Sequence, residues 1–441
     1  MTQTPSASIV AALMSLARDL TVFAQDHTTA SLAELEQAVL EQVRAQLPKV
    51  LEATISVATP SLQGEQRPRR QTCLTCGQSR RCRSWRKRQV QTVCGRISLT
   101  RTWYVCTSCG RGWSPTDEAL GIAAQQRVSA GFEAYLVRLG AVTSFRDAVT
   151  VLELLSGWHV SPETVRQHTE TAGRLSELQQ QEAIGQVERT GESFQPDEPA
   201  PGHLVVETDG VMVRFRDGWH EVKLGVVGGQ VAGQLSALSF VAAREPPDRF
   251  GPRLLTEAAR RDALTPIGWV NPVAEIATMR HVTVLGDGAA WIWNLADEHF
   301  GTRTEIVDYY HACEHLWKVA NSVFGAATPA ASAWARPLSD ALLTAGVAPV
   351  RTALTRLSSS DPTGAEVLRQ EREYFRKNAA RMDYPTFRAL GLPIGSGAVE
   401  SAAKYLVQAR MKRPGSRWSD AGAQAILTLR SHFLSHPSLV A

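Results

Sequence analysis

The sequence predicts a multidomain α+β protein, and three observations support this fold class. The chain of 441 residues is long enough for two or three domains. Its composition changes from helical apolar spacing over 6–58 to a stretch rich in arginine, cysteine and glycine over 67–118. After the proline-rich and acidic segment 191–202, which is predicted to be a linker, apolar strand patterns alternate with helical ones, as in an α/β domain.

The N-terminal region, 1–66, is expected to be a helical hairpin, because Ser31 and Glu34 have the spacing of a capping box ahead of an apolar helical pattern. This region carries three basic and seven acidic groups, whereas 67–113 carries twelve Lys/Arg and no acid. A charge run can simply be a solvated face, but one so one-sided indicates a surface that binds phosphate, most often nucleic acid. The residues of this run expected to contact DNA are Arg86, Lys87 and Arg88.

Four of the seven cysteines form two matched pairs, Cys73/Cys76 and Cys106/Cys109, each with two residues between its members and a glycine after the second. This spacing lets two thiolates bind one metal from a tight turn, and four thiolates make a closed, structural zinc site. The alternative is a set of reduced core cysteines. We therefore expect a zinc ribbon over 67–118, with Cys82 and Cys94 outside the metal site.

The region 119–190 is predicted to contain a helix-turn-helix. One helix runs from Phe145 to about Gly157, and Ser161 with Pro162 gives a strong start signal for the second. Val165 is expected to pack inward. The exposed residues of the second helix would contact a major groove, although two short helices with a turn also occur in ordinary cores. The residues expected to contact DNA are Thr164, Arg166 and Gln167.

Two apolar strand patterns each end in an Asp-Gly pair, at Asp209 and at Asp287. A lone Asp-Gly is usually a turn, but if these two strands are neighbours the carboxylates converge and need a cation, with Mg²⁺ or Mn²⁺ favoured where the substrate is a phosphate. The glycines would leave room for a nucleic-acid backbone. Glu400, at a helix start, is the expected third acid. The cations that follow it, with an expected role in DNA binding, are Lys404, Arg410, Lys412, Arg413 and Arg417, and Trp418 is the tryptophan most suited to touch DNA.

The order Asp209, Asp287, Glu400, within the phrases TDGVMV, LGDGAAWIW and GSGAVES, resembles the DDE triad of bacterial insertion-sequence transposases related to the Mutator-like group. The resemblance runs from about Cys73 to Arg430. It implies an RNase H-like catalytic domain in which the first and fourth strands are neighbours and carry the two aspartates. That domain would comprise a first part over 203–312, a helical insertion over 313–390, and a catalytic helix with a basic tail over 391–441.

The same resemblance implies two-metal phosphoryl transfer on double-stranded DNA, recognition of terminal inverted repeats, and at least a dimer when two ends are joined. The segment DYYHACEHLW adds four possible supporting residues, namely Asp308, His311, Cys313 and His315. Asp308 is a rival for the second acid. Mutator-like enzymes often carry a Cys and a His two residues apart here, whereas one residue separates Cys313 from His315.

Two other functions fit the same sequence: a non-catalytic DNA-binding regulator with a zinc ribbon and helix-turn-helix, and a structure-specific nuclease of the same fold. The N-terminus lacks the basic start of a secretory signal, and no apolar run reaches the roughly 20 residues that span a bilayer. We therefore expect a cytoplasmic, nucleoid-associated bacterial protein without a membrane partner.

Overall fold

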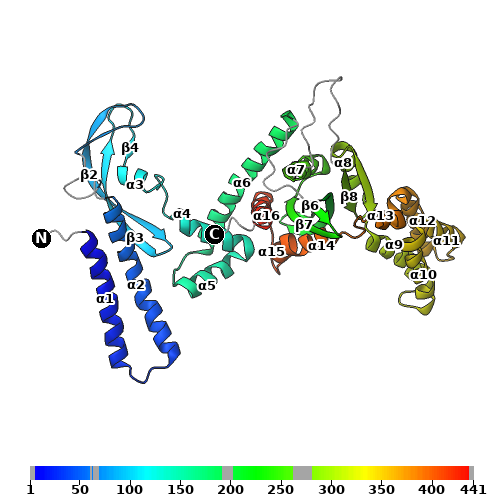
Figure 1. Ribbon diagram of the computed structural model, residues 1–441, viewed down its shortest axis with the longest axis horizontal. Helices are drawn as coiled ribbons and strands as arrows, with labels where there is room; N and C mark the ends of the chain where they lie inside the picture. Colours follow the sequence, from blue (N-terminus) through cyan, green and yellow to red (C-terminus); the bar gives the residue numbers. More distant parts are fainter. Residues whose placement is uncertain (1–4, 60–61, 63–68, 191–201, 262–280, 437–441) are drawn as a thin grey trace. The chain divides into compact units, whose positions relative to one another are not determined.

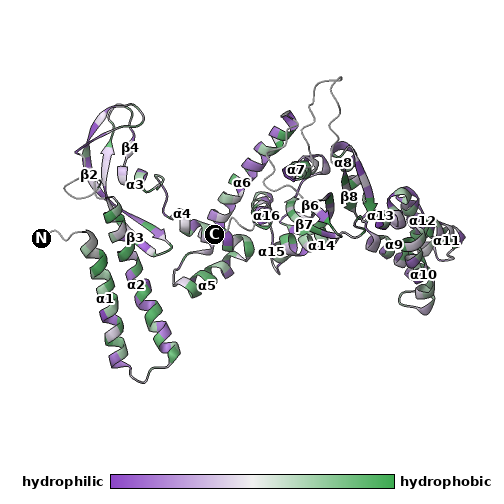
Figure 2. Cartoon of the chain, viewed as in Figure 1, coloured by the Kyte–Doolittle hydropathy of each residue, from purple (hydrophilic) through white to green (hydrophobic). Residues whose placement is uncertain are grey.

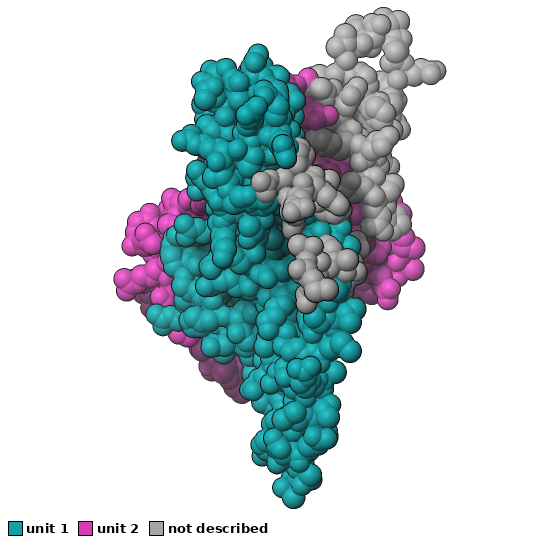
Figure 3. All heavy atoms as spheres, turned by 90° about the vertical axis from the view of Figure 1, so that its left-hand side faces the viewer, with its two compact units in different colours: residues 1–168 teal, residues 169–441 magenta. Residues whose placement is uncertain are grey.

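Figure 1 shows the computed structural model, which describes residues 5–59, 62, 69–190, 202–261 and 281–436. The chain divides into two compact units, coloured separately in Figure 3, with the boundary between His168 and Thr169. This boundary lies inside a helix, not at the expected linker, of which residues 191–201 are outside the described residues. Both units contain helices and a sheet, which confirms the predicted α+β class.

The N-terminal region of unit 1 is the predicted helical hairpin, formed by α1 (Pro5–Asp26) and α2 (Leu32–Ala58). The capping box is confirmed, since the Ser31 amide donates to Glu34 Oε2 at 2.7 Å. The two helices carry many hydrophobic residues (Figure 2), and several of their apolar side chains stay exposed. The exposed side chains are Val10, Leu13, Met14, Val22, Leu32, Leu35, Val39, Leu40 and Val57.

The cysteine-rich region forms a four-stranded antiparallel sheet in the order β1-β2-β3-β4. Its strands are β1 (Arg70–Thr72), β2 (Ser79–Thr92), β3 (Gly95–Val105) and β4 (Gly112–Trp113), and the short helix α3 (Pro115–Ala119) follows. Side chains of β3 alternate between buried and exposed, as expected for a sheet with one covered face. The end of α2 covers that face, because Leu51 and Ile55 pack against the buried Val90, Ile97 and Leu99.

The rest of unit 1 is helical, with α4 (Ala130–Val142), α5 (Phe145–Ser156) and the start of α6 (Pro162–Thr190). The predicted end of the first helix and start of the second are confirmed to within a residue. Gly157 ends α5 in the left-handed conformation with φ of 72°, which suits glycine, and the Ser161 hydroxyl caps α6 by accepting from the Thr164 amide at 3.0 Å. Val165 is fully buried in the small core between these helices.

Unit 2 is built on a five-stranded sheet in the order β7-β6-β5-β8-β9. The strands are β5 (His203–Phe215), β6 (Gly218–Val231), β7 (Gln234–Ala243), β8 (Val282–Gly286) and β9 (Arg303–Val307). β5, β6 and β7 are antiparallel, while β8 and β9 run parallel to β5. The strand pattern before Asp209 was expected to end at that residue, but β5 continues to Phe215, because β6 pairs with it along its whole length. Asp209 therefore lies inside a strand and not at its end.

Helices cover both faces of this sheet. On one face, α7 (Pro247–Arg260) and α8 (Ala290–His299) share an apolar core with β5, β7 and β8. On the other, α14 (Gly397–Ala402) packs on β5 and β6, and α16 (Asp420–Ser435) packs on β7. Between α14 and α16 lie a π-helical segment, η4 (Ala403–Gln408), and α15 (Ala409–Met411). Arg430 of α16 donates to the carbonyls of Tyr405 and Leu406, which the π-helical geometry leaves accessible.

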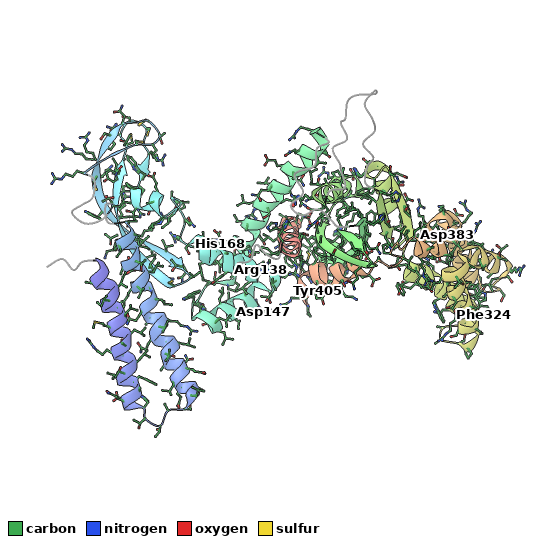
Figure 4. All side chains as sticks on the ribbon, viewed as in Figure 1. Arg138, Asp147, His168, Phe324, Asp383 and Tyr405 are labelled. Atoms are coloured by element: carbon green, nitrogen blue, oxygen red, sulfur yellow. The ribbon has the colours of Figure 1, made fainter. Side chains whose placement is uncertain are left out.

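The helical insertion lies beyond the β9 edge of the sheet (Figure 1). It comprises α9 (Tyr309–Phe324), α10 (Pro329–Ala345), α11 (Ala348–Arg356), α12 (Pro362–Lys377), η3 (Ala379–Met382) and α13 (Tyr384–Ala389), and Figure 4 marks it by Phe324 and Asp383. It begins at 309, four residues earlier than expected, because Asp308 caps α9 immediately after β9. None of the described helices combines the length and apolar character that crossing a bilayer requires.

An almost fully buried arginine ties the second half of α6 to α7 within unit 2. The Arg253 guanidinium, of which 1% is exposed, pairs with Glu245 at 2.7 Å and with Glu177, and it donates to Gln180 at 2.7 Å. Removing one partner of such a buried cluster leaves the opposite charges unpaired.

We therefore expect Arg253→Ala to lower the free energy of unfolding of unit 2 by about 3–5 kcal/mol. Urea unfolding of the full chain, followed by circular dichroism, measures this loss. Arg249→Ala, at an exposed position of the same helix, is the matched control and should change stability by about 0.5 kcal/mol or less. Equal effects of the two substitutions would contradict the structural role of the cluster.

Candidate active site and metal centre

The first two predicted acids meet where β5 and β8 run side by side. Glu207 pairs with Leu285 in the parallel register, and the same offset of 78 residues sets Asp209 level with Asp287. Both aspartates are half-buried. Each carboxylate accepts from the backbone beside it, Asp209 from the Gly210 amide at 2.6 Å and Asp287 from the Ala289 amide at 2.8 Å. The two side chains are thus presented at one place by neighbouring strands.

Glu400 joins them from the first turn of α14, on the sheet face that α14 covers. Burial raises the pKa of Asp209, and the negative charges of Asp287 and Glu400 raise it further, against a smaller opposing effect of the Gly210 amide and His311. The charges of the three acids thus act on one another in one region of unit 2, although among the described residues the carboxylates of Asp209 and Asp287 are not in a group with all ligand atoms within 4.8 Å of one another. The structure therefore places the three predicted acids in the same region from segments that are 78 and 113 residues apart in the chain.

A buried glutamate that the sequence reasoning missed holds the start of α14. The Glu207 carboxyl, 1% exposed in β5, accepts from the Val399 amide at 2.8 Å. Burial raises the pKa of Glu207 to about 7; the α14 amides oppose that rise, while the charges of Asp308 and Glu400 add to it. An acid inside the apolar run HLVVET was the available signal for this residue, because a charged group in a strand interior needs a partner.

Asp308 also holds α14, and it does so with both of its oxygens. Oδ1 accepts from the His311 amide at 2.8 Å, which caps α9, and Oδ2 accepts from the Ser396 amide and hydroxyl at 2.5 and 2.7 Å. Asp308 is completely buried. Hydrogen bonds from His311 and Ser396 lower the pKa of Asp308 despite burial, which acts in the opposite direction. The carboxylate is therefore ionised and nearly saturated with donors.

This saturation bears on the choice between Asp287 and Asp308 as the second acid. Ligand atoms of Asp308, His311 and Glu400 lie within 4.8 Å of one another, so the cluster has the spacing of a metal site. However, a metal bound to Asp308 would compete with donors that cap α9 and α14. Among the described residues, Asp287 Oδ2 has no hydrogen-bond donor, so Asp287 retains the capacity to bind a cation.

Of the other supporting residues, His311 faces the acids, whereas Cys313 and His315 do not. His311 Nδ1 lies 3.5 Å from Asp308 Oδ1, and this pairing raises the pKa of His311 to about 9. The imidazole is thus a cation at neutral pH and offsets part of the negative charge. Cys313 packs against the apolar core, and burial raises the pKa of its thiol. His315 pairs with Glu371 at 2.5 Å on helix α12.

The glycines after the two aspartates have a different role from the one expected. A Cβ at Gly210 would lie 2.2 Å from Glu221 Oε1, and a Cβ at Gly288 would lie 2.8 Å from the ring of Tyr374. Gly288 also has a φ of 98°, which favours glycine. Both glycines therefore admit protein side chains, so the space they leave is already occupied and is not open to a nucleic-acid backbone.

Two of the predicted DNA-binding arginines are buried, and a third predicted contact is buried with them. Arg88 pairs with Asp117 at 2.9 Å and donates to backbone carbonyls. Arg410 is 3% exposed, and its guanidinium lies 4.9 Å from the ring centroid of Trp418, which is itself buried. These three residues were predicted to contact DNA, but in the structure they pack inside the protein. The partner of Arg88 lies 29 residues later in the chain, so the local charge pattern did not reveal it.

The remaining predicted DNA contacts lie at the surface. The exposed ones are Arg86, Lys87, Gln167, Lys404, Lys412 and Arg417, and the partly exposed ones are Thr164, Arg166 and Arg413. Tyr405, beside Lys404 on η4, is exposed as well and is labelled in Figure 4. On α6, Arg166 and Gln167 both donate to Glu163, so a phosphate would have to compete with that carboxylate.

The four paired cysteines form one cluster in unit 1, as the spacing predicted. Their sulfur atoms lie within 4.8 Å of one another, with 3.6 Å between Cys73 and Cys109 and 3.4 Å between Cys76 and Cys106. In each turn the amide of the glycine donates to the carbonyl of the first cysteine at 2.8 Å. Burial opposes ionisation of Cys106, but backbone amides and the Arg80 side chain outweigh it and lower the pKa to about 5. The cluster could therefore hold a metal ion.

The raised pKa of Glu207 predicts a pH dependence of stability in metal-free buffer. Between about pH 4.5 and 7 the unfolded chain loses the Glu207 proton while the folded chain keeps it, so stability falls as pH rises through this window. Glu207→Gln should lack this loss. Its stability relative to the native chain should therefore rise by roughly 3 kcal/mol between pH 4.5 and 8, measured by urea unfolding with a chelator present. A difference that stays constant with pH would contradict the assignment.

The sequence model of the "Uncharacterised protein family (UPF0236)" matches residues 26–323. A curated relative from Streptococcus gallolyticus, "UPF0236 protein in vanSb 3'region", is 24% identical over 357 residues, which cover 78% of this chain and 71% of the relative. The family match includes the four-cysteine cluster and the first two acids, and it ends before Glu400. Because that match spans more than half of the chain, the protein belongs to the UPF0236 family.

Proposed function

We propose that the chain is a DNA transposase that cleaves and joins DNA ends by metal-dependent phosphoryl transfer. The observation that carries the proposal is the convergence of Asp209, Asp287 and Glu400 from two neighbouring parallel strands and a helix. The strand order agrees with the RNase H-like fold that the resemblance implies, because the first and fourth strands of the sheet are neighbours and carry the aspartates. A regulator without catalysis would have no need for acids that repel one another.

The acids fit a hard divalent cation such as Mg²⁺ or Mn²⁺. They supply carboxylate oxygens at a half-buried place. Burial and then the negative charges of Asp287 and Glu400 raise the pKa of Asp209, and a positive ion would oppose both effects. When bound, two such ions would activate the attacking oxygen and stabilise the leaving one. Asp209, Asp287 and Glu400 would hold them, Glu207 and Asp308 fix the helix that carries Glu400, and the His311 cation balances charge beside the site.

The four cysteines fit zinc in a structural role. Tetrahedral coordination with Zn–S bonds of about 2.3 Å separates the sulfurs by about 3.8 Å, close to the 3.4 and 3.6 Å found here. The cluster uses four thiolates and leaves no open position for catalysis. Zinc would hold the ends of the ribbon together, and the ribbon presents the exposed Arg86 and Lys87 to solvent.

DNA is the proposed partner of these surfaces. Exposed cations on the ribbon and after Glu400, together with the second helix of the helix-turn-helix, would bind the backbone and grooves of transposon ends. Joining two ends needs two sets of these surfaces, so we propose at least a dimer in the active complex.

Asp287→Asn should abolish strand cleavage, because a neutral amide binds Mg²⁺ poorly, while leaving the affinity for transposon ends nearly unchanged. The assay uses DNA that flanks the reading frame, with its candidate inverted repeats, and Mg²⁺ or Mn²⁺. We expect a loss larger than the roughly 10–100-fold that follows removal of outer partners of a metal site. Asp297→Asn, at an exposed position of α8, is the matched control and should cleave normally.

If Asp287→Asn lowers the affinity for transposon ends as much as it lowers strand cleavage, the assignment of Asp287 to the active site is wrong. Tight binding of the ends by the native chain, with no cleavage in either metal, would favour the regulator. Cleavage that depends on Asp287 but ignores the repeats would favour a structure-specific nuclease.

Cys76→Ser should remove the bound zinc, which we expect at about one ion per chain, and should weaken end binding because the ribbon loses its cross-link. Metal analysis of the purified protein measures the first effect, and a binding titration measures the second. Cys82→Ser is the matched control, because Cys82 lies in the same sheet and its thiol donates to the Ser84 carbonyl, but it is not one of the four cysteines whose sulfur atoms lie within 4.8 Å of one another. Unchanged zinc in Cys76→Ser would refute the four-cysteine site.

A further inference from the structure

Helix α12 of the helical insertion touches the loop that carries Asp287. The Tyr374 hydroxyl donates to the Asp287 carbonyl oxygen at 2.9 Å. The ring of Tyr374 lies against Gly288, where a Cβ would come within 2.8 Å of ring atom Cε2. Tyr374, which lies 87 positions after Asp287, thus contacts both of the residues that directly follow β8, Asp287 and Gly288.

The other side of this tyrosine is also held. The His315 ring stacks on the Tyr374 ring with 3.7 Å between centroids and an angle of 16°. His315 Nδ1 pairs with Glu371 at 2.5 Å, and Lys318 pairs with the same carboxylate at 2.8 Å. Glu371 is 2% exposed and lies one turn before Tyr374 on α12. The stack and the ion pairs therefore give the phenol a single orientation.

The loop needs such support because of its own sequence. Gly288 is a glycine at positive φ, so the chain directly after Asp287 has little intrinsic preference for one conformation. The side chain of Asp287 is oriented through the Ala289 amide, which belongs to the same loop. A shift of the main chain at 287 would therefore move the carboxylate relative to Asp209 and Glu400.

We propose that Tyr374 is a positioning residue for the catalytic metal site, and that the helical insertion acts through it to set the orientation of Asp287. The inference rests on the proposed function for the identity of the site as one that binds a divalent metal. Tyr374 does not touch the metal or the DNA in this proposal. It holds the main chain of a ligand, and His315 and Glu371 hold Tyr374.

The test compares the full-length native chain with Tyr374→Phe, which keeps the ring and its stack but removes the hydroxyl. Two quantities are measured: the binding of Mn²⁺ alone by calorimetry, and the Mg²⁺ concentration that gives half-maximal cleavage. We expect Tyr374→Phe to weaken Mn²⁺ binding and to raise the Mg²⁺ requirement by roughly tenfold, as loss of an outer partner does at other metal sites. Cleavage should recover at high Mn²⁺, since Mg²⁺ demands the stricter geometry. The melting temperature and end binding should change little.

Tyr309→Phe is the matched control. Its hydroxyl also donates to a main-chain carbonyl, that of Ser339 at 3.2 Å, but this bond lies within the helical insertion. Loss of a phenol hydrogen bond is then the same in both variants, and only Tyr374→Phe releases the Asp287 loop. Asp287→Asn defines how much of the Mn²⁺ binding belongs to the site.

Wild-type Mn²⁺ affinity in Tyr374→Phe would overturn the inference. Equal weakening in Tyr374→Phe and Tyr309→Phe, with equally lowered melting temperatures, would also overturn it, because both effects would then be general loosening of the insertion. If the native chain and Asp287→Asn bind Mn²⁺ equally, the metal site is refuted, and this inference is refuted with it. Binding that depends on both Asp287 and Tyr374, without cleavage of any DNA end, would support the positioning role and refute the transposase.

Discussion

Two buried carboxylates hold the first amides of helix α14, and the arrangement of the candidate site depends on this attachment. The start of a helix leaves amides without partners and carries a partial positive charge, so it binds anions well. Glu207 from β5 and Asp308 from the end of β9 supply those anions to Val399 and Ser396. Each partner needs the other, because an acid buried in a strand without donors is costly. Glu400, which follows Val399 in the first turn of α14, is positioned by these hydrogen bonds.

The local signals in the sequence were sufficient wherever capping decides a boundary. Gly157 and Ser161 define the turn between α5 and α6 through their own backbone geometry, so that turn could be predicted closely. The two cysteine turns are equally local. The course of β5 could not be predicted in this way. Its continuation past Asp209 depends on pairing with β6 along the full strand, and an Asp-Gly pair by itself favours a turn.

The acids of the candidate site could be predicted, and so could Asp308 and His311 beside them, but the support from Tyr374 could not. Asp209, Asp287 and Glu400 stand out as acids beside glycines or at a helix start. Tyr374 carries no comparable signal, because its role comes from a contact across 87 residues. The exposed and buried arginines also look alike in sequence. Arg88 is neutralised by Asp117, beyond the end of the basic run, so only the folded chain separates it from Arg86.

Because the site depends on the attachment of α14, it cannot form until α14 has been synthesised. The strands that carry Asp209 and Asp287 are synthesised long before residues 396–400 emerge. Until then the Glu207 carboxyl lacks the hydrogen bond that it accepts from the Val399 amide in the complete fold. The third acid is also missing. A nascent or prematurely terminated chain therefore has the sheet but not the complete constellation. Under the proposed function, strand cleavage would have to wait until residues 396–400 have been synthesised.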